Sequence, residues 1–423
     1  MLLREKLRLV CVESGEEYLG DQHVIKCSKD ELVRSVYNKK RIEPKDLPGI
    51  WKYIDWLPIS SVPKEFLENP AAVTIYKSKG LAEYLGLKNL YIAYTGYQNG
   101  CNNTCTFKDI EAQSSISRLL EVCRDKIIVL ASDGNVAKSF LHYSRFFDLK
   151  IVITTTEDAR KKRIWHTGVY NKSLILLSLT NGHDYYDAIR LARMISELEG
   201  FVSEGGVRNV ARRDGVGTIL IEAAFKLKRL PDHYFQAVGT GIGPIAVYEA
   251  AERLIEDGRF GKEPPVIHIS QNDPFIPMCD AWWRGDRRID PRFQSEEAKK
   301  LIEQVYAHVL TNRYPAYSIR GGIYDVLKNT NGKAYAVTNE EAYKAQELFE
   351  KLEGYDIVPP AAVTIASLIK AVEQGNIDKN DLVLVHVTGG RCRSLKRLEV
   401  PATIVADSID DAISKLLSYL GKK

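Results

Sequence analysis

One lysine, Lys108, occupies a position from which a side-chain amine could act as a nucleophile. It lies in the segment Asn103–Asp109, after an apolar run at Leu90–Tyr94 that favours a strand and before a stretch in which Ile116 and Leu119 recur with helical spacing. The N-terminus of a helix carries a positive potential, which favours the neutral amine. Such an amine can condense with a carbonyl-bearing cofactor. Taken alone, the lysine fits a solvated surface position better.

A polar turn, Ser132-Asp133-Gly134-Asn135, follows a second apolar run at Ile127–Ser132. Gly134 permits an unusual backbone conformation, and Asn135 can cap the following helix while presenting its amide to a crevice. Backbone N–H groups at such a helix start could also hold a carboxylate. By itself the turn is explained equally well as a plain helix cap.

A glycine-rich loop, Gly239–Gly243 (GTGIG), joins the strand-like run Tyr234–Val238 to a helix in which Pro244 can take the first position. Amides without side chains around them can close on phosphate oxygens. A dinucleotide site would show GxGxxG and an acidic residue after the next strand. Here the next strand, Val266–Ile269, is followed by Ser270-Gln271-Asn272, so the loop favours a single phosphate and disfavours an NAD-dependent oxidoreductase.

The elements that would position these residues alternate between short apolar runs and helical periods. The strand-like runs are Leu90–Tyr94, Ile127–Ser132, Ile151–Thr155, Leu174–Leu179, Tyr234–Val238, Val266–Ile269, Ala334–Val337 and Leu382–Val387. Alternation on this scale predicts an α/β fold built from parallel sheets with helices on both faces.

The N-terminal forty residues have a different character. Cys11 and Cys27 each begin what resembles the remains of a CxxC knuckle, and His23 could add a third ligand, but a zinc site needs four. We therefore expect a small ribbon without a metal. The seven cysteines are odd in number and scattered, so a disulfide framework is not expected. Cys101 and Cys105 have no partner histidines nearby, which disfavours a metal or redox site there.

Composition and charge exclude several classes of protein. The chain has 423 residues, of which 45% are hydrophobic and 27% charged, and its net charge of +4 contains no long basic block. That pattern argues against nucleic acid as a partner. No apolar stretch approaches transmembrane length, and Met1–Val10 carries charges where a signal peptide needs an apolar core. The expected location is the cytoplasm, away from any membrane.

The order of the lysine, the Ser-x-Gly-Asn turn and the glycine loop resembles fold-type II pyridoxal-phosphate enzymes, the tryptophan synthase beta-like fold, and in particular the threonine synthases. Further segments carry the same resemblance: Leu81–Leu87, Asn209-x-x-Arg212-x-x-Gly215, Pro359–Ala362 and Thr388–Gly390. The lysine segment departs from the threonine synthases by having Asn-Thr-Cys-Thr-Phe-Lys-Asp. This departure resembles the archaeal cysteate synthases, and so do the segments Leu47–Pro58, Glu204–Gly206, Arg208–Gly215, Leu230–Ala237, Ser270–Asn272 and Pro274–Met278.

The resemblance implies a role for each site residue. Lys108 would carry pyridoxal 5′-phosphate as a Schiff base and then act as acid and base at the α carbon of the substrate. The cofactor contacts would be Lys108, Asn135, Gly239, Thr240, Gly241, Ile242, Gly243 and Thr388. Thr388 would meet the pyridine nitrogen, an arrangement that suits elimination and replacement chemistry. The substrate contacts would be Ser132, Asp133, Gly134 and Arg212, with Arg208 and Arg213 as weaker candidates.

The resemblance also implies a division into domains. An N-terminal degenerate zinc-ribbon-like segment would span residues 1–48. A large cofactor-binding domain would combine residues 49–113 and 205–423, and a small α/β domain would span residues 114–204. Each of these two domains would hold a parallel sheet, and the cofactor would lie between them.

The activity implied is replacement of the phosphate of O-phospho-L-serine by sulfite, which gives L-cysteate for coenzyme M biosynthesis. The partners would be a phosphoamino acid and an anionic nucleophile, and the enzyme would be a homo-oligomer, most simply a dimer. A threonine synthase acting on O-phosphohomoserine and a phosphoserine-dependent cysteine synthase remain alternatives. A non-catalytic pyridoxal-phosphate-binding paralogue is disfavoured because Lys108, Asn135, the glycine loop and Thr388 are all retained.

Overall fold

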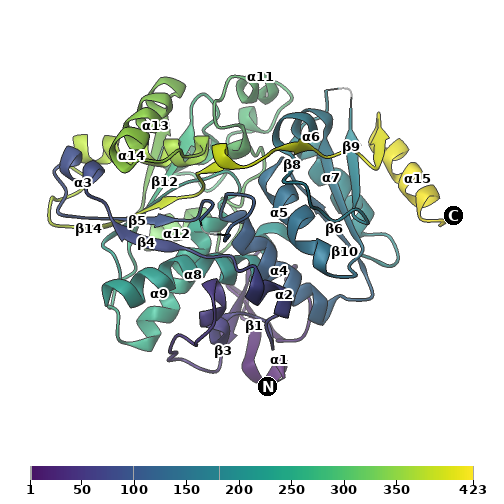
Figure 1. Cartoon of the computed structure of the whole chain (residues 1–423), viewed down its shortest axis with the longest axis horizontal. Helices are drawn as coiled ribbons and strands as arrows, with labels where there is room; N and C mark the ends of the chain where they lie inside the picture. Colours follow the sequence, from purple (N-terminus) through teal and green to yellow (C-terminus); the bar gives the residue numbers. More distant parts are fainter. Residues whose placement is uncertain (1, 99, 181, 423) are drawn as a thin grey trace.

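The computed structural model describes residues 2–98, 100–180 and 182–422, and it contains two large sheets that lie side by side (Figure 1). The first has six strands, in the order β13 (Lys333–Val337), β12 (Val266–Asn272), β11 (His233–Ala237), β14 (Leu382–Val387), β5 (Asn89–Tyr94) and β4 (Thr74–Lys77). All neighbours are parallel except β4, which runs antiparallel to β5 at the edge.

Helices cover both faces of the six-stranded sheet. On strand β11, Tyr234 packs into one apolar cluster and Phe235 into another, so the strand is buried on both sides, as expected for a parallel sheet. The helices around this sheet are α3 (Gly80–Leu85), α8 (Val210–Leu227), α9 (Ile242–Asp257), α10 (Pro277–Trp283), α11 (Ala298–Glu303), α12 (Ile323–Asn329), α13 (Asn339–Glu353) and α14 (Pro359–Glu373).

The second sheet has five parallel strands. Their order is β10 (Phe201–Ser203), β6 (Ile127–Ala131), β7 (Ile151–Thr156), β9 (Ile175–Leu179) and β16 (Ile404–Ala406). The helices beside it are α5 (Asn135–Tyr143), α6 (Glu157–Arg163), α7 (Tyr185–Ser196) and α15 (Ile409–Tyr419). Leu191 of α7 and Leu416 of α15 enter the same apolar cluster as the strands. The expected α/β class and the parallel sheets are therefore confirmed.

The C-terminal part of the chain returns to the five-stranded sheet. After β14, the short strand β15 (Leu398–Glu399) pairs with β8 (Trp165–His166), and β16 then adds beside β9. Figure 1 shows this yellow segment crossing from one sheet to the other. The arrangement differs from the expected division, in which residues 205–423 stayed with the larger sheet. A strand of three residues has too little periodicity to be recognised in the sequence.

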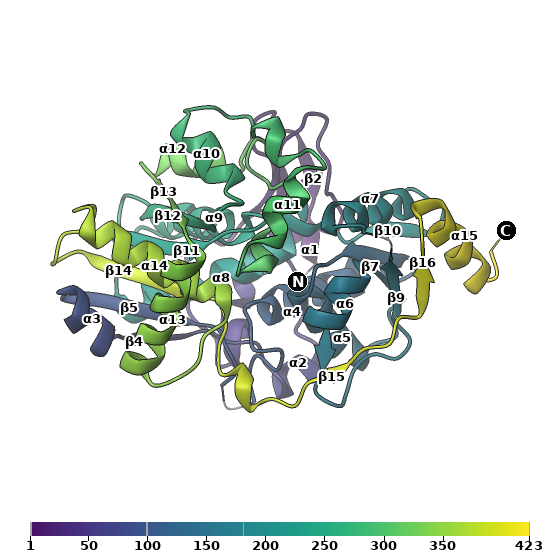
Figure 2. The same ribbon diagram turned by 90° about the horizontal axis from the view of Figure 1, so that it is seen from above.

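Two helices lie between the sheets, α4 (Lys108–Val122) and α8, as both views show (Figures 1 and 2). Helix α4 is buried along most of its length, including the polar side chains of Glu111, Gln113 and Ser115. Polar groups at such positions need partners inside the protein, so their contacts define the region between the sheets.

The N-terminal ribbon consists of α1 (Leu3–Lys6) and three antiparallel strands, β1 (Leu7–Cys11), β2 (Glu17–Leu19) and β3 (Val33–Tyr37), and α2 (Lys64–Glu68) follows. His23 does not approach the two cysteines but places Nε2 2.8 Å from the carbonyl oxygen of Ser203. Glu31 does approach them, and its carboxylate accepts hydrogen bonds from the N–H groups of Glu13 and Ser14.

The expectation that disulfides would not form is wrong. Cys11 bonds to Cys27, and Cys105 bonds to Cys392. The second pair is separated by 287 residues, and the two loops meet only because β5 and β14 are neighbours in the sheet. Spacing along the sequence therefore gave no signal for it.

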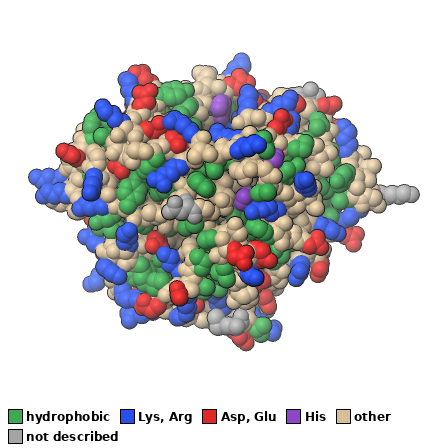
Figure 3. All heavy atoms as spheres, in the orientation of Figure 1, with side chains coloured by type: hydrophobic (Ala, Val, Ile, Leu, Met, Phe, Trp, Pro, Cys, Tyr) green, Lys and Arg blue, Asp and Glu red, His purple; other side chains and the backbone are tan. Residues whose placement is uncertain are grey.

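The surface carries charges of both signs. Figure 3 shows lysine and arginine interspersed with aspartate and glutamate over the face in view. Within the described parts of the chain, no helix is both long enough and apolar enough to span a membrane.

Candidate active site

Lys108 is the first residue of α4, as the sequence predicts, and the loop before it is fixed against the loop after β14. The N–H of Phe107 donates to the carbonyl oxygen of Thr388 at 3.0 Å, and Thr106 and Gly389 form an isolated antiparallel bridge. The Cys105–Cys392 disulfide joins the same two loops. Residues nearly three hundred positions apart are thus held in one place.

Every residue that the sequence assigns to the site lies on the wall of one cavity of about 740 Å³. These residues are Lys108, Ser132, Asp133, Gly134, Asn135, Arg212, Gly239, Thr240, Gly241, Ile242, Gly243 and Thr388. They come from the ends of β6, β11 and β14 and from the starts of α4, α5, α8 and α9. Ligands in open α/β folds bind at such carboxyl ends of parallel strands.

The cavity contains a buried hydroxyl group that has no partner. Thr388 is 3% exposed, and its Oγ1 makes no hydrogen bond with any other described residue. Buried polar atoms are normally satisfied, so an unsatisfied one beside a cavity indicates a missing ligand atom. The ring nitrogen of pyridoxal phosphate would fit this requirement.

The glycine loop packs so closely against its neighbours that two of its positions admit only glycine. Gly241 is the N-cap of α9 and has a φ of 91°, and a Cβ there would lie 2.6 Å from a side-chain carbon of Ile323. A Cβ on Gly243 would lie 2.1 Å from the side chain of Gln236. Helix α9 begins at Ile242, two residues before the expected Pro244. The start of this helix, with its free N–H groups and the positive end of its dipole, is part of the cavity wall and favours binding of an anion there.

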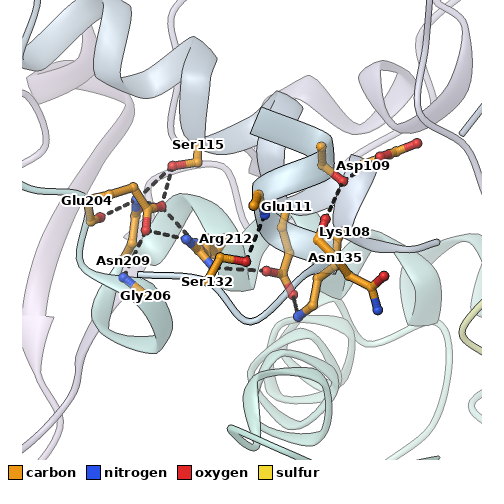
Figure 4. A network of polar contacts seen from close by, with 12 residues as sticks. Lys108, Asp109, Glu111, Ser115, Ser132, Asn135, Glu204, Gly206, Asn209 and Arg212 are labelled. Carbon is orange, nitrogen blue, oxygen red and sulfur yellow. Dashed lines mark hydrogen bonds and ion pairs between the residues drawn. The ribbon is translucent and has the colours of Figure 1, made fainter. Parts of the chain in front are cut away.

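The turn before α5 is built differently from the expectation in one respect. Ser132, rather than Asn135, accepts the hydrogen bonds at the helix start, from the N–H groups of Gly134 at 3.2 Å and Ala137 at 2.8 Å. Asn135 is the first residue of the helix, and its side-chain amide makes no hydrogen bond to the other described residues. It points into the same space as Lys108 (Figure 4). This amide is therefore available to a ligand.

Asp133 is engaged by a protein partner. Its Oδ1 lies 2.8 Å from a guanidinium nitrogen of Arg163. Burial raises the pKa of the Asp133 carboxyl to about 6, although the Arg163 charge acts in the opposite direction. The side chain of Asp133 thus supports the turn, and the backbone of the turn faces the cavity.

A chain of buried charges connects Lys108 to the centre of the molecule (Figure 4). The Nζ of Lys108 donates to Oε1 of Glu111 at 2.5 Å, and Oε2 of Glu111 accepts from Arg212 at 3.2 Å. Arg212 also makes a two-pronged contact with Glu204, at 2.7 and 2.5 Å. Ser115 and Asn209 donate to the same Glu204 carboxylate.

These contacts change the expectation for Arg212. Its guanidinium lies on the cavity wall, but three of its nitrogens donate to carboxylates, so two negative charges compensate its own. Burial lowers the pKa of Lys108, and the Glu111 charge opposes that effect. Burial alone would raise the pKa of Glu204, but Arg212 holds it below its ordinary value.

Of the two neighbouring arginines, Arg213 is not on the cavity wall, whereas Arg208 lies on it with its charge already paired. Arg213 is fully buried and pairs with Glu249, while Arg208 pairs with Asp30 at the edge of the ribbon. Consecutive helical residues point in different directions, which explains why only Arg212 of the adjacent pair faces the site.

Sequence reasoning missed four features in or next to the cavity. Glu111 stands three residues after Lys108, a helical spacing that brings side chains together and could have identified it. Glu204 and Tyr185 also line the cavity. Glu204 belongs to a segment that resembles the cysteate synthases, but nothing in the sequence indicates its contact with Arg212, and nothing local marks Tyr185. The ribbon segment 25–30 forms part of the cavity wall, although the ribbon was expected to be a separate unit.

Comparison with known proteins agrees with this geometry. The family model described as "Pyridoxal-phosphate dependent enzyme" matches residues 72–389. The cysteate synthase of Methanosarcina barkeri is 44% identical over 393 residues, covering 92% of this chain and 93% of the relative. The cysteate synthase of Methanocella paludicola is 44% identical over 392 residues, covering 92% and 90%.

Solved structures share the fold at low sequence identity. A pyridoxal 5′-phosphate-dependent aspartate racemase superposes with a TM-score of 0.57 at 14% identity, covering 76% of this chain and 92% of the other. Maize serine racemase has a TM-score of 0.55 at 12% identity, covering 82% and 92%. These similarities establish the fold-type II architecture. The matched family and the close relatives show that the chain belongs to the pyridoxal-phosphate dependent enzymes, in the family that contains the cysteate synthases.

Proposed function

We propose that this protein makes L-cysteate by replacing the phosphate of O-phospho-L-serine with sulfite. The observation that carries the proposal is the convergence of Lys108, Asn135, the glycine loop and Thr388 on one cavity, in a chain 44% identical to a cysteate synthase over 92% of its length. In the overall reaction the Cβ–O bond of the substrate breaks, a Cβ–S bond forms, and inorganic phosphate leaves.

Residues of this chain would hold the cofactor at four points. The N–H groups of the glycine loop at the start of α9 bind its phosphate, and the Asn135 amide donates to its ring oxygen. The Thr388 hydroxyl meets its ring nitrogen, which satisfies the buried oxygen that has no partner in the protein. Lys108 binds it covalently. When bound, the cofactor stabilises the negative charge that develops at the α carbon of the substrate.

Lys108 carries the proton transfers. With the cofactor and substrate bound, Lys108 Nζ would remove the proton from the α carbon of the substrate and later return it. Burial lowers the pKa of this amine, which brings it closer to the range where a base is effective near neutral pH.

The start of α5 provides a site for the substrate carboxylate. The N–H groups of Asn135 and Val136 donate to no acceptor within the described residues, and both residues line the cavity. Helix N-termini favour negative charge in this position.

Positive charge for the leaving phosphate and the incoming sulfite comes from the cavity mouth. Both groups are anions, so they require fixed cations or N–H donors. Lys26 and Lys29 of the ribbon lie on the cavity wall, and neither forms an ion pair with a described carboxylate. Because the charge of Arg212 is already compensated, these ribbon lysines take on that role.

The proposal is tested by a product assay. Purified holoenzyme receives O-phosphoserine with sulfite, with sulfide or with neither, and O-phosphohomoserine in parallel, while phosphate and amino-acid products are measured. Cysteate and phosphate in equal amounts, formed only with phosphoserine and sulfite, are expected. Threonine from phosphohomoserine, or cysteine from phosphoserine and sulfide, in the absence of cysteate would overturn the assignment.

The proposal includes assembly as a dimer, the common state of this fold. Light scattering would then give twice the chain mass of 47.7 kDa.

A further inference from the structure

Glu111 is a buried carboxylate that none of the roles above uses. Its side chain has no exposed area, and it lies one helical turn from Lys108 on α4. One carboxylate oxygen accepts from Lys108 at 2.5 Å and the other from Arg212 at 3.2 Å (Figure 4). A carboxylate held between two cations in this way has a fixed position.

We propose that Glu111 is a positioning residue for Lys108, which holds the lysine side chain by a direct ion pair and keeps its proton inside the site between the two proton transfers at the α carbon. The proposal rests on the proposed role of Lys108 as acid and base. In the first transfer the α C–H bond breaks and an N–H bond forms on Nζ. In the second the same proton returns to carbon, so no outside acid or base is required.

The arrangement of charges supports this role. Arg212 alone would repel the ammonium form of Lys108, but Glu204 compensates Arg212 through two hydrogen bonds. Glu111 completes the compensation of Arg212 with one oxygen and accepts from Lys108 with the other. Burial lowers the pKa of the Lys108 amine, while Glu111 and the more distant Glu204 raise it and Arg212 lowers it.

Other titratable groups around the lysine do not compete for its proton. His386 of β14 is buried, and its pKa is lowered to about 3 by burial and by the Lys108 charge, so it stays neutral. The pKa of Tyr185 is raised to about 12 by burial, so the phenol also stays neutral. Asp133 is paired with Arg163. Glu111 is the one described carboxylate in direct contact with Lys108 Nζ.

The test measures the titration of one amine. The full-length chain freed of cofactor is trace-acetylated with acetic anhydride over a range of pH, and the modification of Lys108 is followed by mass spectrometry. In Glu111→Gln, the midpoint for Lys108 is expected to fall by about one to three pH units, the usual effect of losing an opposite charge at this distance. Glu111→Asp keeps the negative charge but places it farther from Lys108, so a smaller fall of the Lys108 midpoint is expected.

A matched control distinguishes this role from a structural one. Glu249→Gln removes another buried carboxylate that pairs with an arginine of α8, Arg213, but Glu249 has no contact with Lys108. It should lower the thermal stability without moving the Lys108 midpoint. If Glu111→Gln does not fold, Glu111→Asp decides alone. A Lys108 midpoint that is unchanged in the folded variants would overturn the proposal, whichever substrate the product assay identifies.

Discussion

Cys105 and Cys392 form a disulfide that ties the loop before Lys108 to the loop after Thr388. The lysine and the buried hydroxyl therefore belong to segments joined by a covalent bond as well as by the Phe107–Thr388 hydrogen bond. This connection holds two walls of the cofactor cavity at a fixed separation.

The disulfides predict a definite number of free thiols. The chain denatured without reductant should react at Cys101, Cys123 and Cys279 only, and the reduced chain at all seven cysteines. Cys392→Ser should add one reactive thiol, at Cys105, and lower the free energy of unfolding by about 2–5 kcal/mol, a typical cost of losing a native disulfide. Seven reactive thiols in the parent without reductant would contradict the pairing.

Thr388→Val should separate cofactor binding from stability. Because Oγ1 of Thr388 has no protein partner, removing it should leave the melting temperature of the cofactor-free chain unchanged or slightly higher. Cofactor affinity should fall about five- to tenfold, the value of one hydrogen bond. Thr364→Val is the control, since Thr364 accepts from Ala237 and donates to Pro360, and its loss should lower stability. Undiminished cofactor affinity in Thr388→Val would place the ring nitrogen elsewhere.

Two glycine substitutions test the phosphate loop. Gly241 and Gly354 both have positive φ angles, of 91° and 81°, but a Cβ would strike Ile323 only at Gly241. Gly241→Ala should therefore cost about 1–3 kcal/mol more than Gly354→Ala and should weaken cofactor binding. Gly354→Ala should cost about 1 kcal/mol and leave binding intact. Equal effects of the two substitutions on cofactor affinity would argue against the loop as the phosphate site.

Asp133 predicts a pH dependence of stability. Its pKa is raised by burial from 3.8 to about 6, so the folded chain binds this proton more tightly than the unfolded chain does. The stabilising contribution of Asp133 is therefore fully present below about pH 4. It is lost as the pH rises through 6, which lowers the free energy of unfolding by about 1–3 kcal/mol. Asp133→Asn cannot ionise, so its stability relative to the parent should rise between pH 4 and 7. Parallel curves for the two proteins would contradict the assignment.

The sequence predicted the buried strands well because they are continuous apolar runs followed by helices. Ile127–Ser132 corresponds to β6, and Leu382–Val387 to β14 without any change of bounds. It could not predict β16, which has three residues and depends on pairing with a strand more than two hundred positions earlier. The Cys105–Cys392 pair was missed for the same reason, since only the assembled sheet brings its two loops together.

The sequence predicted which residues line the site better than it predicted the contacts between them. Motif order placed Lys108, Asn135 and Thr388 in one site, and they line one cavity. Sequence could not show that Arg212 is compensated by Glu204 and Glu111, because those contacts depend on how α8 packs against α4 and on the path of the chain after β10. Side-chain direction on a helix is fixed by its packing, which a motif does not contain.

The central claim is that Lys108 carries the cofactor, and covalent trapping tests it most directly. Holoenzyme is reduced with sodium borohydride, digested and examined by mass spectrometry for a pyridoxyl group. The adduct is expected on the peptide that contains Lys108, and Lys108→Ala should lose both the adduct and the visible absorption of the cofactor. An adduct on another lysine, such as the buried Lys138, or visible absorption unchanged in Lys108→Ala, would contradict the account.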